Sequence, residues 1–162
     1  MPDTSSVPKE ASHATSQENN DASTKIVFDD EADFERAQRG LIATLPEGKV
    51  TIDNQTVWDC SQYDFLRENS SAPDTVHPGL WRQGRLNAIH GLFEVMDGVW
   101  QVRGYDISNL TLVAGKTGWI LIDVLTTAAT AKACLELANE HLGARPVKAV
   151  IYTHSHADHF GG

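Results

Sequence analysis

The sequence predicts an α/β domain that is preceded by a disordered polar tail, and three observations support this. Residues 1–24 contain one large aliphatic side chain, Val7, and no aromatic side chain. Such a stretch cannot bury enough apolar surface to offset the entropy lost on ordering. Two hairpin patterns begin near residue 91. An amphipathic helix between two apolar strands follows them, and this order is typical of a parallel crossover.

The first two regions of the chain are a disordered tail over residues 1–25 and an extension over residues 26–90. In the extension, apolar spacing predicts one helix from Asp30 that ends at Pro46. Two short strands, 49–53 and 55–58, are predicted across a turn at Asp53-Asn54. Residues 59–78 are predicted to be irregular, and residues 80–89 fit either a helix or an ordered loop.

The third region, residues 91–162, opens with the two hairpins. Residues 92–96 pair with 99–103 across Asp97-Gly98, which predicts a type I′ turn. Residues 109–114 pair with 118–123 across a short turn that contains Gly115.

A helix and a strand complete the third region. Thr126 or Thr127 caps a helix that runs to about His141, and Gly143 ends it. Residues 147–153 then form an apolar β-branched strand. The predicted buried stripe of the helix consists of Ala131, Cys134, Leu135, Ala138 and Leu142.

Composition excludes several classes of function. The chain of 162 residues carries a net charge of −9 with no basic cluster, so it has no nucleic-acid footprint. It contains no membrane-spanning stretch and no secretory signal, so we expect a cytoplasmic location and no stable membrane insertion. Cys60 and Cys134 are expected to be reduced, partly buried thiols.

The last ten residues concentrate metal-binding side chains. Three of the seven histidines fall within six positions, and one aspartate lies among them. His154 and His156 follow a buried strand two positions apart, so both can face one metal ion. Asp158 and His159 are adjacent and can reach a second ion. Imidazole and carboxylate suit Zn²⁺, and Fe or Mn also suits the carboxylate-bearing position.

Two other interpretations of this loop are an exposed histidine-rich loop with incidental metal affinity and a structural zinc site. No cysteine lies near the cluster, although structural zinc sites usually contain cysteine. Four ligands cannot complete two metal shells, so we expect further ligands beyond residue 162. The sequence is therefore expected to be the N-terminal part of a longer protein, and residues 1–162 alone to be inactive and poorly folded.

The pattern His-x-His-x-Asp-His at the end of a buried strand resembles the signature of the metallo-β-lactamase superfamily. Four upstream segments and the loop region together resemble the linear and secondary alkyl sulfatases of that superfamily. These segments are residues 34–43, 75–83, 91–95, 101–111 and 150–162.

The resemblance implies the first half of a metallo-β-lactamase αββα sandwich. It implies two zinc ions, with His154 and His156 on the first and Asp158 and His159 on the second. Asp158 would also be catalytic, by orienting the bridging water. Asp123 resembles a buried aspartate that supports the site from beneath, although a helix-entry cap is another interpretation of it.

The activity that the resemblance implies is hydrolysis of amphiphilic sulfate esters such as dodecyl sulfate to an alcohol and sulfate. It also implies a homodimer of the full-length protein. Two kinds of alternative stay open. One is another hydrolase of this fold, acting on a lactone, thioester, β-lactam or phosphodiester. The other is an iron redox enzyme or an inactive relative.

Three groups of upstream residues have both a functional and a structural interpretation, and the structural one is favoured for each. The tryptophans are expected to be core or cross-strand residues rather than a lipid-chain cleft. Arg82, Arg85 and Arg103 are expected in ion pairs rather than on a sulfate. Residues 105–111 are expected to form a structured connection between the hairpins rather than to line the approach to the site.

Overall fold

The computed structural model describes residues 9–27, 30–69 and 71–162. It contains a six-stranded sheet in the order β1-β4-β5-β6-β7-β8 and a two-stranded sheet, β2-β3. The helices are α1 (His13–Lys25), α2 (Ala32–Gln38), α3 (Asp64–Glu68), α4 (Pro78–Asn87), α5 (Ala128–Leu142) and α6 (Ala157–Phe160), with 3-10 turns η2 (Pro46–Gly48) and η3 (Cys60–Tyr63). The strands are β1 (Leu41–Ala43), β2 (Lys49–Ile52), β3 (Gln55–Asp59), β4 (Gly91–Met96), β5 (Val99–Arg103), β6 (Leu110–Ala114), β7 (Trp119–Ile122) and β8 (Val147–Ile151).

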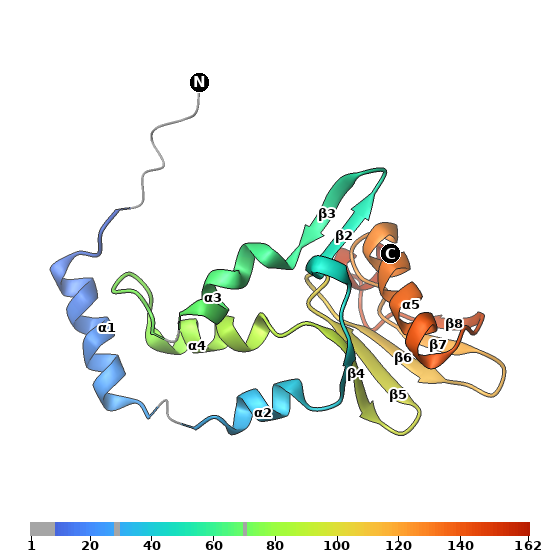
Figure 1. The fold of residues 1–162 in the computed structure, drawn as a ribbon, viewed down its shortest axis with the longest axis horizontal. Coiled ribbons are helices and arrows are strands. Elements are labelled where there is room, and N and C mark those ends of the chain that lie inside the picture. The colour runs from blue at the N-terminus through green and yellow to red at the C-terminus, as the bar shows by residue number, and fades with distance from the viewer. Residues whose placement is uncertain (1–8, 28–29, 70) are drawn as a thin grey trace.

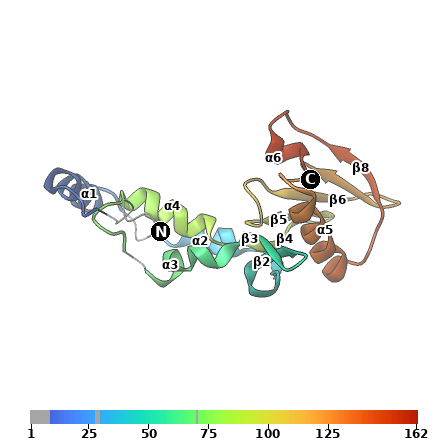
Figure 2. The same ribbon diagram turned by 90° about the horizontal axis from the view of Figure 1, so that it is seen from above.

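The C-terminal region has the predicted order of two hairpins followed by strand, helix and strand. Neighbouring strands from β4 to β7 pair antiparallel, and β7 pairs parallel with β8 after the α5 crossover. Figures 1 and 2 show the sheet and α5 on one side of the molecule and the helices α1–α4 on the other. The α/β class predicted from the sequence is thereby confirmed.

The core lies between the sheet and α5. Trp119, Leu92 and Leu112 are fully buried on the sheet, and Val50 of β2 joins the same cluster. The buried residues of α5 are Thr130, Cys134, Leu137 and Ala138. The predicted stripe was therefore partly wrong, because the helix is turned so that Leu137 is buried while Ala131 and Leu135 are only half-buried.

The helix predicted from Asp30 to Pro46 is wrong in its second half. Helix α2 ends at Gln38, and residues 41–43 form β1, which pairs antiparallel with β4. Gly40 has a φ of 77° and its carbonyl accepts the Glu94 N–H at 2.7 Å. After the turn at Gly40 the chain therefore forms hydrogen bonds with the sheet edge instead of continuing the helix. Apolar periodicity alone does not predict this change.

Helix α1 departs from the disorder predicted over residues 1–25. Residues 13–25 form a helix whose N-cap, Ser12, accepts the Thr15 N–H. The Asn19 amide also donates to the Asp74 carbonyl at 2.7 Å, which ties α1 to the residues before α4. Because α1 has no buried residue, the N-cap and this distant hydrogen bond stabilise it instead of core packing. The part of the prediction on residues 1–8 lies outside the described residues.

The turns show one confirmed pattern and one difference. Asp53 and Asn54 both have positive φ, 48° and 64°, as a type I′ turn between β2 and β3 requires. At the β4–β5 turn only Gly98 has a positive φ (77°), so the type I′ prediction at Asp97-Gly98 was wrong. The pairing of β4 with β5 is irregular between Glu94 and Met96, and this irregularity accommodates a different turn.

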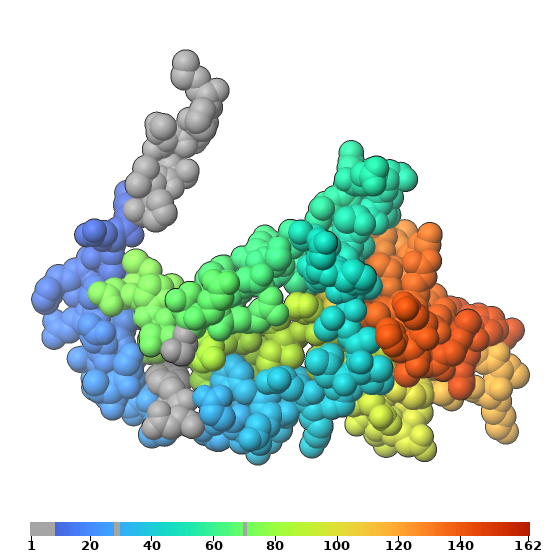
Figure 3. All heavy atoms as spheres, in the orientation of Figure 1, coloured from blue at the N-terminus to red at the C-terminus, as the bar shows by residue number. Residues whose placement is uncertain are grey.

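Residues 80–89, left open by the sequence, belong mainly to helix α4. Its arginines pack on α2: Arg82 pairs with Asp33 at 3.1 Å, and Arg85 lies over the Phe34 ring at 4.9 Å. Trp81 packs on Phe65 of α3 with ring centroids 5.8 Å apart. In Figure 3 these helices form a lobe that the cyan residues around β1–β3 join to the sheet.

Cys60 and Cys134 are free, as predicted, and both are buried rather than partly buried. Burial raises the pKa of the Cys60 thiol to about 11 and that of Cys134 to about 12. Both thiols are therefore neutral at physiological pH, so neither is a nucleophile. No helix within the described ranges is long and apolar enough to cross a bilayer.

Gly40→Ala should detach β1 from the sheet. A Cβ at this position would lie 2.2 Å from the Glu94 carbonyl oxygen. A left-handed φ also costs a non-glycine residue about 1–2 kcal/mol. Hydrogen exchange followed by mass spectrometry should show the Glu94 amide exchanging at least about tenfold faster. Gly98→Ala is the matched control, because Gly98 has the same φ of +77° but no atom within 4 Å of the added Cβ. Equal exchange in both variants would contradict this account.

Candidate metal centre

The histidine-rich loop follows β8 and is held against the segment between β7 and α5. Three backbone hydrogen bonds connect the two. Asp123 N–H donates to Ile151 O at 2.9 Å, Val124 N–H to His159 O at 3.0 Å, and Gly162 N–H to Leu125 O at 3.1 Å. Gly161 and Gly162 permit this approach, since a Cβ on Gly162 would lie 1.7 Å from the Val124 carbonyl oxygen. The loop is thus a fixed part of the sheet edge.

Asp123 supports the loop from beneath. Its side chain is buried, and its carboxylate accepts the Thr153 N–H at 2.8 Å and the Thr153 hydroxyl at 2.8 and 3.0 Å. The same carboxylate is 2.8 Å from His159 Nδ1. Burial by itself would raise the pKa of Asp123, but the hydrogen bonds from Thr153 and His159 outweigh it and hold the pKa below its usual value.

The ionised Asp123 carboxylate fixes the orientation of His159. A carboxylate only accepts, so the proton between the two groups belongs to Nδ1 of the imidazole. This leaves Nε2 as the nitrogen available to a metal ion, in the way that outer carboxylates orient metal-binding histidines. His159 Nε2 lies 3.1 Å from Asp158 Oδ2. A lone pair and a carboxylate oxygen this close require a positive charge between them, either a proton or a metal ion.

The four predicted ligands lie together as two pairs. His154 Nε2 is 3.1 Å from His156 Nδ1, and Asp158 Oδ2 is 3.1 Å from His159 Nε2. The rings of His154 and His159 are adjacent, with centroids 3.9 Å apart. His154 and His156 are exposed, whereas Asp158 and His159 are half-buried.

The donor atoms of these pairs fit zinc in type and spacing. Two ligands of a tetrahedral zinc ion at about 2.0–2.1 Å are roughly 3.3 Å apart, close to the separation within each pair. Among the residues that the structure describes, no group of three or more His, Cys, Asp or Glu side chains is arranged to hold one ion. Each pair therefore supplies two ligands, one fewer than the three that proteins usually give a catalytic zinc ion.

Asp106 and Ser108 lie in the connection 105–111 near the loop, and the sequence singled out neither of them individually. The buried Asp106 carboxylate accepts the Thr126 N–H at 3.0 Å and the Thr126 hydroxyl at 2.5 Å. The Ser108 hydroxyl donates to the Asp158 carbonyl. Residues 105–111 are thus a structured connection, as expected. The only sequence signal for these contacts was that Asp106 follows a strand. That signal does not identify Thr126, 20 positions after Asp106, or Asp158, 50 positions after Ser108, as their partners.

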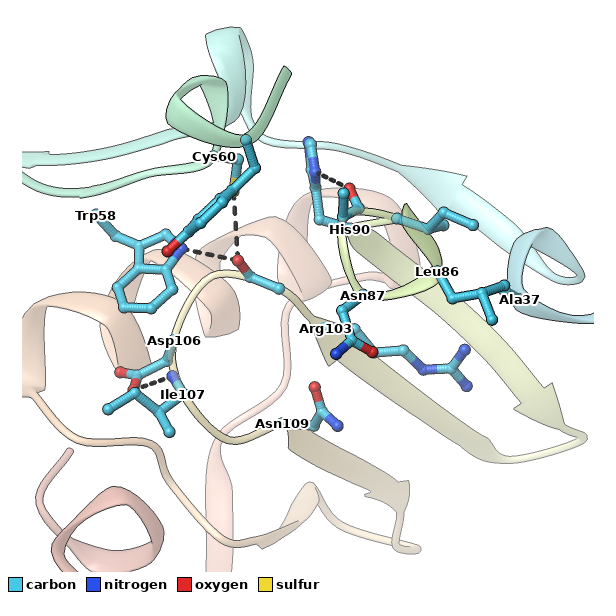
Figure 4. A pocket seen from close by; sticks show the side chains of 14 residues that line it. Ala37, Trp58, Cys60, Leu86, Asn87, His90, Arg103, Asp106, Ile107 and Asn109 are labelled. Carbon is cyan, nitrogen blue, oxygen red and sulfur yellow. Dashed lines mark hydrogen bonds between the residues drawn. The ribbon is translucent and has the colours of Figure 1, made fainter. Parts of the chain in front are cut away.

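A cavity of about 410 Å³ adjoins this connection at the junction between the sheet and the extension. Figure 4 shows Trp58 and Cys60 on one side of it, above Asp106 and Ile107, with His90 across from them. The Trp58 indole and the Cys60 thiol both donate to the Gly104 carbonyl. None of the four predicted ligands lines this cavity, so the cavity is separate from the predicted metal site in the histidine-rich loop.

The tryptophans have structural roles, as expected, whereas the ion pairs expected for the three arginines form only at Arg82, because Arg85 and Arg103 lie over aromatic rings instead. Trp119 is fully buried and lies edge-on to Trp100 with centroids 5.6 Å apart. Arg82 is ion-paired with Asp33. Arg103 lies over the Phe93 ring at 4.6 Å and donates to the Gln101 amide oxygen.

Comparison with known families identifies the class of the domain. Residues 103–162 match the metallo-beta-lactamase superfamily. This segment includes β6, β7, α5, β8 and the loop with the four predicted ligands. This part of the chain is similar to the metallo-beta-lactamase superfamily, as its loop motif indicates.

The individual relatives that the chain resembles are alkylsulfatases. The chain is 48% identical over 155 residues to a linear primary-alkylsulfatase and 47% identical over 154 residues to an (R)-specific secondary-alkylsulfatase, both from Pseudomonas sp.. It is 46% identical over 155 residues to an alkyl/aryl-sulfatase from Saccharomyces cerevisiae. Each alignment covers 95% of this chain but only 23–24% of the relative.

A solved structure shows the same relationship. The stereoselective inverting sec-alkylsulfatase from Pseudomonas sp. superimposes with a TM-score of 0.88 at 48% identity, over 95% of this chain and 24% of that one. The predicted resemblance to alkyl sulfatases and the predicted part of a metallo-β-lactamase fold are confirmed. The chain spans about a quarter of the length of these relatives.

Asp123→Asn should destabilise the loop even without metal. The amide has one accepting oxygen instead of two, so it cannot accept from both Thr153 and His159. An unpaired buried donor costs about 1–3 kcal/mol. Calorimetry of the chelator-treated full-length protein should show the transition of this domain lowered by several degrees, at about 2–4 °C per kcal/mol. Asp97→Asn, at an exposed aspartate in the β4–β5 turn, should leave it unchanged. An unshifted transition in Asp123→Asn would refute the supporting role.

Proposed function

We propose that the whole protein containing this chain is a zinc-dependent alkyl sulfatase, which hydrolyses sulfate esters of the dodecyl sulfate kind to an alcohol and sulfate. The observation that carries this proposal is the pairing of four metal-binding side chains at 3.1 Å in a chain 46–48% identical to three alkylsulfatases. Since the chain is about a quarter of those relatives in length, this activity is a property of the complete protein.

In the proposed centre, His154 and His156 hold one zinc ion, and Asp158 and His159 hold the second. Zinc ions at these residues would supply Lewis-acid activation of the attacking water and of the ester. The Asp158 carboxylate is a hydrogen-bond acceptor at the edge of the site and can orient that water. Asp123 keeps Nε2 of His159 directed at the site through its 2.8 Å hydrogen bond to Nδ1.

Recognition of a sulfate ester requires a locally built anion site, because the net charge of −9 on this chain repels anions. Arg82 and Arg85 are engaged with α2 in the extension. We therefore propose that the groups that bind the sulfate, like the remaining metal ligands, come from parts of the protein outside this chain.

The names of the relatives favour sulfate esters over the other substrates that the loop motif allows. All three are sulfatases, whereas none is named for a lactone, thioester, β-lactam or phosphodiester. The homodimer and the cytoplasmic location remain predictions.

The four-ligand centre can be tested on the full-length protein. Plasma emission analysis should find about two zinc ions per subunit, and a chelator should abolish dodecyl sulfate hydrolysis until zinc is restored. Loss of a residue that only supports a metal ligand typically lowers activity by about 10–100-fold. Changing His154, His156, Asp158 or His159 itself to alanine should lower activity by more than this.

His141→Ala is the matched control, since His141 is an exposed histidine at the end of α5. It should keep both the zinc and the activity. A lactone and a chromogenic β-lactam assayed beside dodecyl sulfate test the substrate class. Faster turnover of either would contradict the proposed substrate, and full activity with all four ligands changed to alanine would contradict the proposed centre.

A further inference from the structure

Ser108 joins the β5–β6 connection to the histidine-rich loop. Its hydroxyl donates to the backbone carbonyl of Asp158, fifty positions further along the chain. Asp158 and the next residue, His159, form the second of the two ligand pairs. The hydrogen bond therefore acts on the backbone that carries this pair and on neither side chain of it.

The Asp158 carbonyl needs a donor because α6 ends early. In a continued helix the N–H of residue 162 would donate to the carbonyl of residue 158. Gly162 N–H donates instead to Leu125 O at 3.1 Å. Ala157, one position earlier, does receive its helical bond, from Gly161 N–H at 2.8 Å. The Ser108 hydroxyl thus replaces the Gly162 N–H as donor to the Asp158 carbonyl, because the Gly162 N–H binds the β7–α5 segment instead.

Ser108 is itself held on a rigid support. Two residues before it, the buried Asp106 carboxylate accepts the Ile107 N–H at 2.7 Å and the hydroxyls of Thr126 and Thr130. Thr126 in turn lies against the loop, since a Cβ on Gly161 would be 2.2 Å from its carbonyl oxygen. The connection and the loop are therefore both fixed to the start of α5.

We propose that Ser108 is a positioning residue for the metal pair Asp158 and His159. By holding the Asp158 carbonyl it sets the backbone direction from which both ligand side chains project. His154 and His156 precede α6, and the Ser108 hydroxyl donates to neither of them but to the Asp158 carbonyl. The inference rests on the proposed metal centre, and it assigns Ser108 to the second ion only.

Zinc affinity of the full-length protein tests this assignment independently of turnover. The metal-stripped protein is titrated with zinc against a chromophoric chelator, which resolves two binding steps. Ser108→Ala should weaken one step by about tenfold, the lower end of the effect of an outer partner on metal affinity, and leave the other unchanged. Ser108→Thr keeps the hydroxyl and should restore the affinity to within about threefold of the parent.

Ser61→Ala is the matched control, because it removes a serine that donates to a carboxylate, Asp59, far from the loop. It should leave both steps unchanged. Unaltered zinc binding in Ser108→Ala, equal weakening of both steps, or a threonine variant as weak as the alanine variant would each overturn the proposal. A parent that binds two zinc ions but leaves dodecyl sulfate intact would count against the proposed function, whereas the Ser108 comparison would still decide the positioning role.

Discussion

The buried Asp123 carboxylate links the end of β7 to the loop after β8. It accepts from the backbone and hydroxyl of Thr153 and from the His159 ring. Asp123 has a φ of 52° and Leu125, two positions later, a φ of 70°. Such conformations cost a non-glycine residue about 1–3 kcal/mol and persist only where surrounding contacts over-determine them. Here the contacts are the hydrogen bonds that hold the loop, so this local strain is coupled to the placement of the four proposed metal ligands.

The parallel pairing of β7 with β8 explains why the site lies where it does. Parallel strands bring their carboxyl ends to the same edge, so Asp123 and Thr153 meet although they are 30 positions apart. Helix α5 is the crossover that makes this pairing possible, and Thr130 in its first turn donates to Asp106 of the β5–β6 connection. The end of β7, the start of α5 and the β5–β6 connection therefore meet beneath the histidine-rich loop. None of these three segments contains any of the four proposed ligands.

The two ligand pairs differ in their surroundings. His154 and His156 are exposed, whereas Asp158 and His159 are half-buried and supported from behind by Asp123 and Ser108. Support of this kind restricts the rotamers of a ligand and lowers the entropy lost when a metal ion binds. The structure thus gives the second pair more preorganisation than the first. Under the proposed function, further ligands from outside this chain would have to contribute more at the first ion.

The sequence by itself determined the strand–helix–strand order, the hairpins, the buried cysteines and the ligand loop, because these depend on local periodicity, turn residues and motif spacing. Tertiary structure decided three other features. Residues 41–43 became β1 because the edge of β4 offered hydrogen bonds to a segment with helical spacing. Residues 13–25 became helical with help from the distant Asp74 carbonyl. Asp106 and Ser108 acquired their roles from partners 20 and 50 positions away, and such contacts leave no periodic trace in a sequence.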